Sequence, residues 1–118
     1  MNYKKRIGDL GERIARLYLE ACGYVIVCCN YRALRCEIDI IAKKGGELHF
    51  VEVKTRTDKK IPALEAIDDI KCKHIERTAE YYLYKNKISD VAYHFDAVEV
   101  YIEEESMVVN YVQRIIEN

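Results

Sequence analysis

The sequence predicts an α/β domain in which helices flank a mixed central β-sheet, with elements in the order α-β-β-β-α-β-β. The prediction rests on a helical apolar period near the N-terminus, a pair of strands around a double glycine, and a second helical period before two more strands. The chain has 118 residues, the size of one domain, so we expect a single domain over residues 1–118.

The first helix is expected over residues 9–22, and Gly23 follows it as a C-terminal glycine. Residues 24–29 are rich in β-branched side chains and predict a strand. Residues 30–32 are expected to begin a connection. The helix is indicated by apolar residues that recur at spacings of three and four, namely Leu10, Ile14, Leu17, Tyr18 and Ala21.

Gly45-Gly46 predicts a tight hairpin turn, because both central positions of a primed turn take positive φ. Lys44 would then lie opposite Glu47, and this pair fixes the register of both strands. A longer loop around the two glycines is the alternative, and it would shift the pairing by up to two residues.

Counting outward from the turn places Asp39 opposite Glu52, and Glu37 opposite Lys54. Side chains alternate along a strand, so these four charged residues are expected to share one face of the hairpin. The other face would then pack into the core through Ile38, Ile40, Val51 and Val53.

The C-terminal half predicts a helix within residues 62–85, followed by strands over 91–102 and 108–116. Lys71 interrupts the apolar stripe of this helix. Asp68-Asp69 is either a solvated helix face or a break between two shorter helices.

The formal net charge is −1, but the charge is uneven along the chain. Residues 1–60 hold 13 Lys/Arg and 8 Asp/Glu, whereas residues 61–118 hold 6 and 12. Such asymmetry indicates either a polyanionic partner or an unevenly charged solvated surface. The 5 cysteines form no C-x-x-C pair, and no apolar signal or membrane segment is evident, so we expect reduced thiols in a cytoplasmic protein.

The charged face of the hairpin is suited to a divalent metal. Asp39 and Glu52 repel each other unless a hard cation lies between them, and Mg²⁺ or Mn²⁺ prefers such oxygen ligands. The backbone carbonyl of Val53 would be a further ligand, and Lys54 would stabilise charge on a phosphoryl group. The alternative is a solvent-facing sheet in which Lys54 screens Glu37.

Asp39 followed by Glu52-Val53-Lys54 is similar to the PD-(D/E)xK nuclease signature. The wider pattern, from about residue 8 to 100, resembles the small bacterial YraN-like family, an uncharacterised group of predicted endonucleases with a restriction-endonuclease-like fold. That pattern comprises Gly11-Glu12, Ala15, Tyr18-Leu19, Gly23-Tyr24, Asn30-Tyr31-Arg32, 37–42, 50–56, Lys71, Ala79 and Phe95-Asp96.

The resemblance implies that Asp39, Glu52 and Lys54 form the catalytic core. It also implies that Glu12, on the first helix, reaches the metal; the alternative for this residue is a surface glutamate. Lys71 matches a lysine of the family's second helix, whereas a lysine that extends out of an apolar stripe is the alternative. The residues expected to support the site are Glu37 and Lys71.

Five cations are expected to flank the site and grip phosphates, although each one alone is also explained as a solvated charge. They are Arg32, Arg35, Arg56, Lys59 and Lys60. The sequence departs from the family pattern at Cys36, which replaces a glycine, and at His94, which replaces an arginine. The first change is expected to alter the start of the strand, and the second to weaken a phosphate contact.

The resulting hypothesis is a Mg²⁺- or Mn²⁺-dependent endonuclease that hydrolyses nucleic acid, with DNA as the favoured substrate. Branched or damaged DNA is suggested by fold analogy alone. A homodimer is left open, because nucleases that cut both strands often act in pairs; no membrane contact is expected. One alternative is a non-catalytic nucleic-acid-binding or scaffold protein that retains the fold. Another is an enzyme for a smaller phosphodiester, which the acidic C-terminal half would suit.

Overall fold

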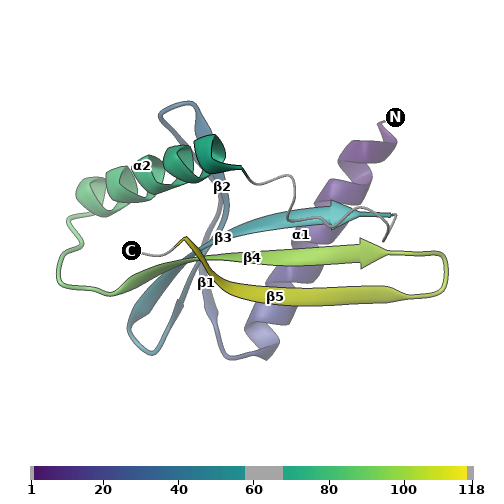
Figure 1. Cartoon of the computed structure of the whole chain (residues 1–118). Helices are drawn as coiled ribbons and strands as arrows, with labels where there is room; N and C mark the ends of the chain where they lie inside the picture. The colour runs from purple at the N-terminus through teal and green to yellow at the C-terminus, as the bar shows by residue number, and fades with distance from the viewer. Residues whose placement is uncertain (1, 58–67, 117–118) are drawn as a thin grey trace.

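The structure is a computed structural model that describes residues 2–57 and 68–116. Its elements follow the predicted order α-β-β-β-α-β-β, as Figure 1 shows. They are α1 (Tyr3–Ala21), β1 (Val25–Ala33), β2 (Cys36–Lys44), β3 (Glu47–Arg56), α2 (Asp69–Lys85), β4 (Tyr93–Ile102) and β5 (Met107–Ile116).

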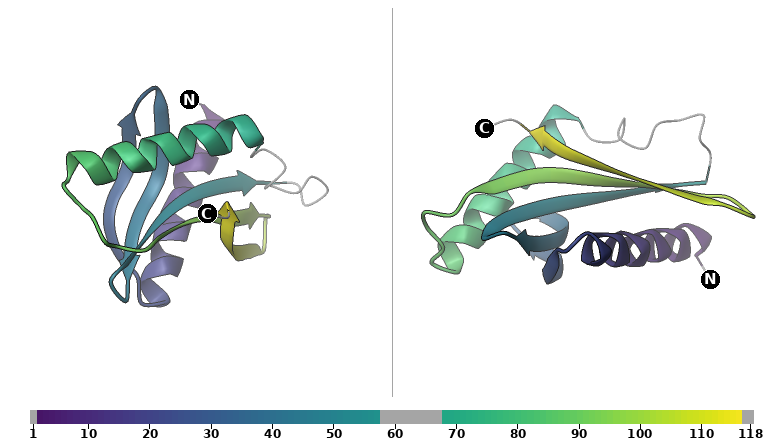
Figure 2. Two further views of the ribbon diagram at one scale, coloured as in Figure 1. Left: turned by 60° about the vertical axis from the view of Figure 1, so that its left-hand side comes forward. Right: turned by 90° about the horizontal axis from the view of Figure 1, so that it is seen from below.

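The five strands form one mixed sheet in the order β1-β2-β3-β4-β5. Neighbouring strands are antiparallel except β3 and β4, which are parallel and are joined through α2. The two helices flank the twisted sheet, as the two views of Figure 2 show. The predicted fold class is therefore confirmed, and the arrangement is compatible with a restriction-endonuclease-like fold. Neither helix of the described residues is long and apolar enough to cross a membrane.

Both faces of the sheet are buried, because each carries its own apolar cluster. Ile40 and Val51 pack with residues of α1, whereas Ile41 and Phe50 pack with residues of α2. Consecutive strand residues point to opposite faces, so the two clusters lie on opposite sides of the sheet. Ile38 belongs to the cluster under α2 rather than to that of Ile40, which corrects the prediction that they share a face.

Two predicted boundaries near the N-terminus are wrong. The first helix begins at Tyr3 rather than at residue 9, because the Asn2 side chain accepts a hydrogen bond from the Lys5 amide and caps it. The first strand continues to Ala33, through residues expected to form a connection. The turn to β2 is only Leu34-Arg35, and both residues have positive φ, 51° and 62°.

The second helix starts where Asp68-Asp69 interrupts the predicted helical pattern. Asp68 is the N-cap, and its side chain accepts a hydrogen bond of 2.8 Å from the Lys71 amide. An uninterrupted helix with Asp68-Asp69 on its solvated face is therefore excluded, because α2 begins at these aspartates. Residues 62–67 of the predicted helix lie outside the described residues.

The predicted hairpin register is confirmed from the turn to the middle of the strands. Gly45 and Gly46 have φ of 60° and 80°, and the Cα pairs run from Lys44–Glu47 to Ile40–Val51. The ladder ends there, so the backbone pairs expected beyond it, Asp39 with Glu52 and Glu37 with Lys54, are not formed in the described strands.

Asp96 joins β3, β4 and β5 through a buried polar network that the sequence did not indicate. Its carboxylate lies 2.6 Å from His49 Nδ1, and accepts hydrogen bonds from the Tyr111 hydroxyl (2.5 Å) and the Arg114 amide (3.0 Å). Burial alone would raise the pKa of Asp96, but the hydrogen bonds from His49, Tyr111 and Arg114 hold it below its usual range. The ionised carboxylate therefore anchors the edge strand β5.

We expect Asp96→Asn to lower the free energy of unfolding at pH 7 by roughly 1.5–3 kcal/mol, the range for hydrogen bonds to a charged group. Because the pKa is lowered by folding, the stabilisation is present above the usual carboxyl value of 3.8 and is lost as the pH falls through the lower folded value. Urea unfolding between pH 7 and pH 3 should show the wild type approaching the variant. A constant difference across that range would contradict this role.

Candidate metal-dependent active site

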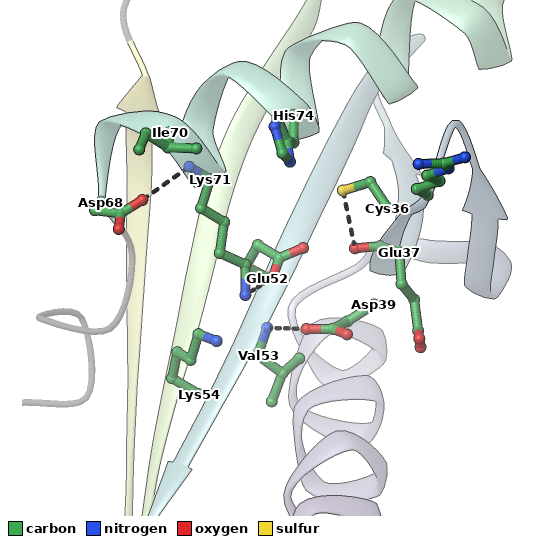
Figure 3. A pocket seen from close by; sticks show the side chains of 11 residues that line it. Cys36, Glu37, Asp39, Glu52, Val53, Lys54, Asp68, Ile70, Lys71 and His74 are labelled. Carbon is green, nitrogen blue, oxygen red and sulfur yellow. Dashed lines mark hydrogen bonds and ion pairs between the residues drawn. The ribbon is translucent and has the colours of Figure 1, made fainter.

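A cavity of about 480 Å³ opens where β2 and β3 separate, at the end of the hairpin away from its glycine turn. The first turns of α2 cover it, as Figure 3 shows. Asp39, Glu52 and Lys54 all line this cavity. It is also lined by the two residues expected to support the site, Glu37 and Lys71.

Asp39 explains why the strands separate. Its Oδ2 accepts a hydrogen bond of 2.7 Å from the Val53 amide, so this side chain takes the place of a backbone acceptor on β2. In an extended antiparallel pair, the N–H and C=O of one residue point to the same neighbour. The Val53 carbonyl therefore points into the same gap, as a backbone metal ligand would require.

Three carboxylates, one from α1 and two from β2, meet beside the cavity. Glu12, Glu37 and Asp39 each place one oxygen so that all three lie within 4.8 Å of one another. Glu12 comes from α1, so the fold brings this helix to the hairpin. The Asn30 amide donates to Glu37 at 2.7 Å and lies 3.3 Å from Glu12, which holds the two glutamates together.

Glu52 lies on the other side of Asp39 and is not part of the three-carboxylate group. It is only 2% exposed, and its Oε2 lies 3.4 Å from Lys71 Nζ. Its Oε1 is buried with no hydrogen-bond partner among the described residues. Lys71 therefore extends from α2 into the cavity and contacts Glu52 there.

Burial and neighbouring charges shift the pKa values of the two carboxyl groups and the two lysines in the cavity. Burial and the neighbouring Glu52 raise the pKa of Asp39 to about 8. Burial also raises the pKa of Glu52, against the opposing effect of Lys71 and Lys54. Burial and the nearby Lys71 lower the pKa of Lys54. For Lys71, burial favours the neutral form, but contacts with Lys54 and Glu52 outweigh it and raise the pKa.

The donor set fits a hard divalent cation. Carboxylate and carbonyl oxygens are the ligands that Mg²⁺ and Mn²⁺ prefer, and such ions take one or two carboxylates with waters and phosphate oxygens. No group in the described part of the chain satisfies the buried Oε1 of Glu52, and such an oxygen is costly unless a cation or a water satisfies it. A cation would also relieve the repulsion between Asp39 and Glu52 that the raised pKa of Asp39 reflects.

The predicted phosphate-binding cations do not form one group. Arg32 donates from Nε to Glu37 Oε2 at 3.1 Å, so it supports a carboxylate instead. Arg35 lines the cavity, and Arg56 lines a neighbouring cavity together with Lys54 and Glu12. Lys59 and Lys60 lie outside the described residues.

The residues Asn30 and His74 were not assigned to the site from the sequence. Asn30 belongs to the matched Asn30-Tyr31-Arg32 pattern, but residues 30–32 were expected to begin a connection. Asn30 instead lies on β1 and donates a hydrogen bond to Glu37. His74 lines the cavity from α2, one turn after Lys71, and no motif indicated it.

Neither departure from the family pattern disturbs the carboxylates. Cys36 is the first residue of β2 and pairs regularly with Ala33, so the strand starts without distortion, contrary to expectation. His94 contacts Glu47 at 3.2 Å and does not line the cavity.

Comparison with known proteins gives the family. The model of the uncharacterised protein family UPF0102 matches residues 11–100. This chain belongs to UPF0102. A UPF0102 protein of Caldicellulosiruptor saccharolyticus is 41% identical over 91% of this chain and 92% of its own length. A UPF0102 protein of Clostridioides difficile is 43% identical over 88% of this chain and 91% of its own length.

The UPF0102 match confirms the resemblance to the YraN-like family. It covers the site from Glu12 on α1, through Asp39 and Glu52-Val53-Lys54, to Lys71 on α2. The names of the relatives state membership of UPF0102 and no activity, so a function for this UPF0102 protein has to be argued from the site.

Proposed function

We propose that this UPF0102 protein is a Mg²⁺- or Mn²⁺-dependent nuclease that hydrolyses phosphodiester bonds, with DNA as the favoured substrate. The observation that carries the proposal is the division of charge within one site. Carboxylates from α1 and β2 gather on one side of the Val53 backbone. Two lysines and the buried Glu52, whose Oε1 has no hydrogen-bond partner within residues 2–57 and 68–116, lie on the other.

Asp39, Glu52, Glu12 and the Val53 carbonyl are the groups that would hold the cation. A divalent ion supplies Lewis-acid polarisation of a phosphoryl oxygen and lowers the pKa of a water molecule. Glu37 adds a carboxylate next to Glu12 and Asp39. Asn30 keeps the two glutamates oriented, because it donates to both.

Lys54 would stabilise the negative charge that develops on the phosphoryl group. It is half-buried beside Glu52, and a cation in such a site acts more strongly on charge than one in water. Burial and Lys71 lower the pKa of Lys54, so its ammonium group gives up a proton more readily than an ordinary lysine does. Lys71 would position Glu52 through its 3.4 Å contact.

The test is cleavage of labelled single-stranded, duplex and branched DNA, and of RNA, with Mn²⁺, with Mg²⁺ and with a chelator. We expect metal-dependent cleavage of at least one DNA substrate. Glu52→Gln and Lys54→Ala should abolish it, because they remove a proposed ligand and the cation that faces the phosphate. Lys43→Ala removes an exposed charge near the hairpin turn and should leave the rate unchanged.

Cleavage that survives in both site variants would contradict the proposal. Tight binding of nucleic acid without cleavage, unchanged by these substitutions, would favour a binding or scaffold protein that retains the fold. Cleavage restricted to small phosphodiesters would keep the metal site but overturn the proposed substrate.

A further inference from the structure

A further cavity, of about 380 Å³, is lined by Leu34, Arg35, His74 and Arg77. We refer to these four residues as the cationic groove. Arg35 and Leu34 form the turn between β1 and β2, and His74 and Arg77 lie on α2. The groove has two permanent positive charges and no carboxylate in its lining, unlike the acidic site beside it.

The two arginines of the groove are available for a ligand. Both are exposed, and neither forms an ion pair with an acidic side chain among the described residues. Arg32, close by on β1, shows the contrast, because its guanidinium is engaged by Glu37. A surface that concentrates unpaired guanidinium groups suits a phosphate, which arginine binds through two parallel hydrogen bonds.

The groove is built by the docking of α2 on the first hairpin. Thr78 is fully buried in this contact, and its hydroxyl lies 3.4 Å from the Ala33 carbonyl at the start of the turn. Leu34 and Arg35 both have positive φ, so the backbone is held in a conformation that side chains other than glycine rarely adopt. The position of the turn relative to Arg77 is therefore determined by the fold.

The groove is continuous with the proposed active site. Arg35 and His74 line both cavities, so a ligand that leaves the carboxylates along α2 meets Arg77 next. Leu34 is 50% exposed and supplies an apolar surface beside the arginines. An apolar side chain beside two guanidinium groups suits a polynucleotide strand, which presents both bases and phosphates.

We infer that the cationic groove binds the backbone of the substrate strand next to the phosphate that is cleaved. Arg35 and Arg77 would contact a neighbouring phosphate, and Leu34 would contact the adjoining base or sugar. The inference rests on the proposed function for the class of ligand, but it concerns binding and not hydrolysis.

The experiment measures binding of a fluorescent single-stranded DNA 20-mer by anisotropy, with the Glu52→Gln protein as the parent so that the probe stays intact. Arg35→Ala and Arg77→Ala should each weaken binding by about 3- to 10-fold. Each should also reduce the slope of log K against log salt by about 0.7, the value for one phosphate contact on a single strand. Lys85→Ala removes one positive charge from the same helix outside the groove and should change neither quantity.

A second variant separates binding from stability. Arg35→Gly removes the guanidinium but suits the positive φ at this position, so it should weaken binding without lowering the thermal midpoint. The inference is overturned if the groove variants bind as Lys85→Ala does, or if the parent binds no DNA. Groove-dependent binding in a protein that cleaves nothing would support the inference and refute the nuclease. Normal cleavage by the wild type, together with DNA binding that the groove variants leave unchanged, would support the nuclease and refute the inference about the groove.

Discussion

Replacing Gly11 with alanine should destabilise the protein and weaken the proposed metal site together. A Cβ atom at this position would overlap Thr55 Oγ1 and lie 2.8 Å from Thr55 Cβ, so the contact between α1 and β3 must shift. Overpacking of this kind typically costs about 1–3 kcal/mol. Glu12 follows Gly11 on the same helix, so its carboxylate would move away from Asp39 and Glu37. We expect a lower thermal midpoint and a reduced rate of Mn²⁺-dependent cleavage.

Gly8→Ala is the matched control for this prediction. It makes the same change one turn earlier in α1, where a Cβ meets no atom within 4 Å. Alanine is a better helix former than glycine by roughly 0.5–1 kcal/mol, so this variant should be slightly more stable with unchanged cleavage. Equal behaviour of the two variants would show that the close contact of α1 with Thr55 does not position Glu12.

Replacing Asp39 with asparagine should lower the rate of cleavage without lowering the stability of the protein. An asparagine oxygen can still accept the hydrogen bond from the Val53 amide, while the repulsion from Glu52 is removed. The free energy of unfolding without metal should therefore stay level or rise by roughly 0.2–1 kcal/mol, the size of a typical side-chain pair interaction across strands. Loss of a residue that only supports a metal ligand typically lowers activity about 10- to 100-fold. The Asp39→Asn substitution should lower the rate of cleavage by more than that.

Asp90→Asn provides a control with the same chemistry at an exposed site outside the cavity. It should leave both cleavage and urea unfolding unchanged. A large loss of stability in Asp39→Asn would mean that the carboxylate has a structural role, and unchanged cleavage would exclude it from the active site.

The hairpin was predictable because local chemistry determines it. Two adjacent glycines suit the positive φ of both turn positions, and the register from Lys44–Glu47 to Ile40–Val51 follows by counting. The count fails beyond Ile40 because Asp39 bonds to the Val53 amide with its side chain. The alternation of side chains along a strand does not show where a side chain takes the place of a backbone hydrogen-bond acceptor.

The membership of the carboxylate cluster depends on tertiary contacts that the sequence alone does not give. Glu37 was expected opposite Lys54, but the separation of the strands turns it toward Glu12 and Asn30. Glu12 could be assigned only through the family resemblance, because its place beside Asp39 depends on the close approach of Gly11 to Thr55.

The network around Asp96 was missed for a similar reason. Its partners His49, Tyr111 and Arg114 come from β3 and β5, far apart in the chain, and no spacing rule connects them. The bulge in the β4–β5 ladder that lets the Arg114 amide reach Asp96 has no glycine or other signal in the sequence. Long-range polar contacts of this kind become visible only in the folded chain.

The central claim is that the fold assembles a divalent-metal site from α1, β2 and β3. Its most direct test is an equilibrium titration with Mn²⁺, in which free ion is followed by electron paramagnetic resonance for the wild type and for Glu12→Gln. The account predicts one bound ion per chain in the wild type, with affinity reduced at least about 10-fold in the variant. No saturable binding, or equal affinity in the two proteins, would contradict it.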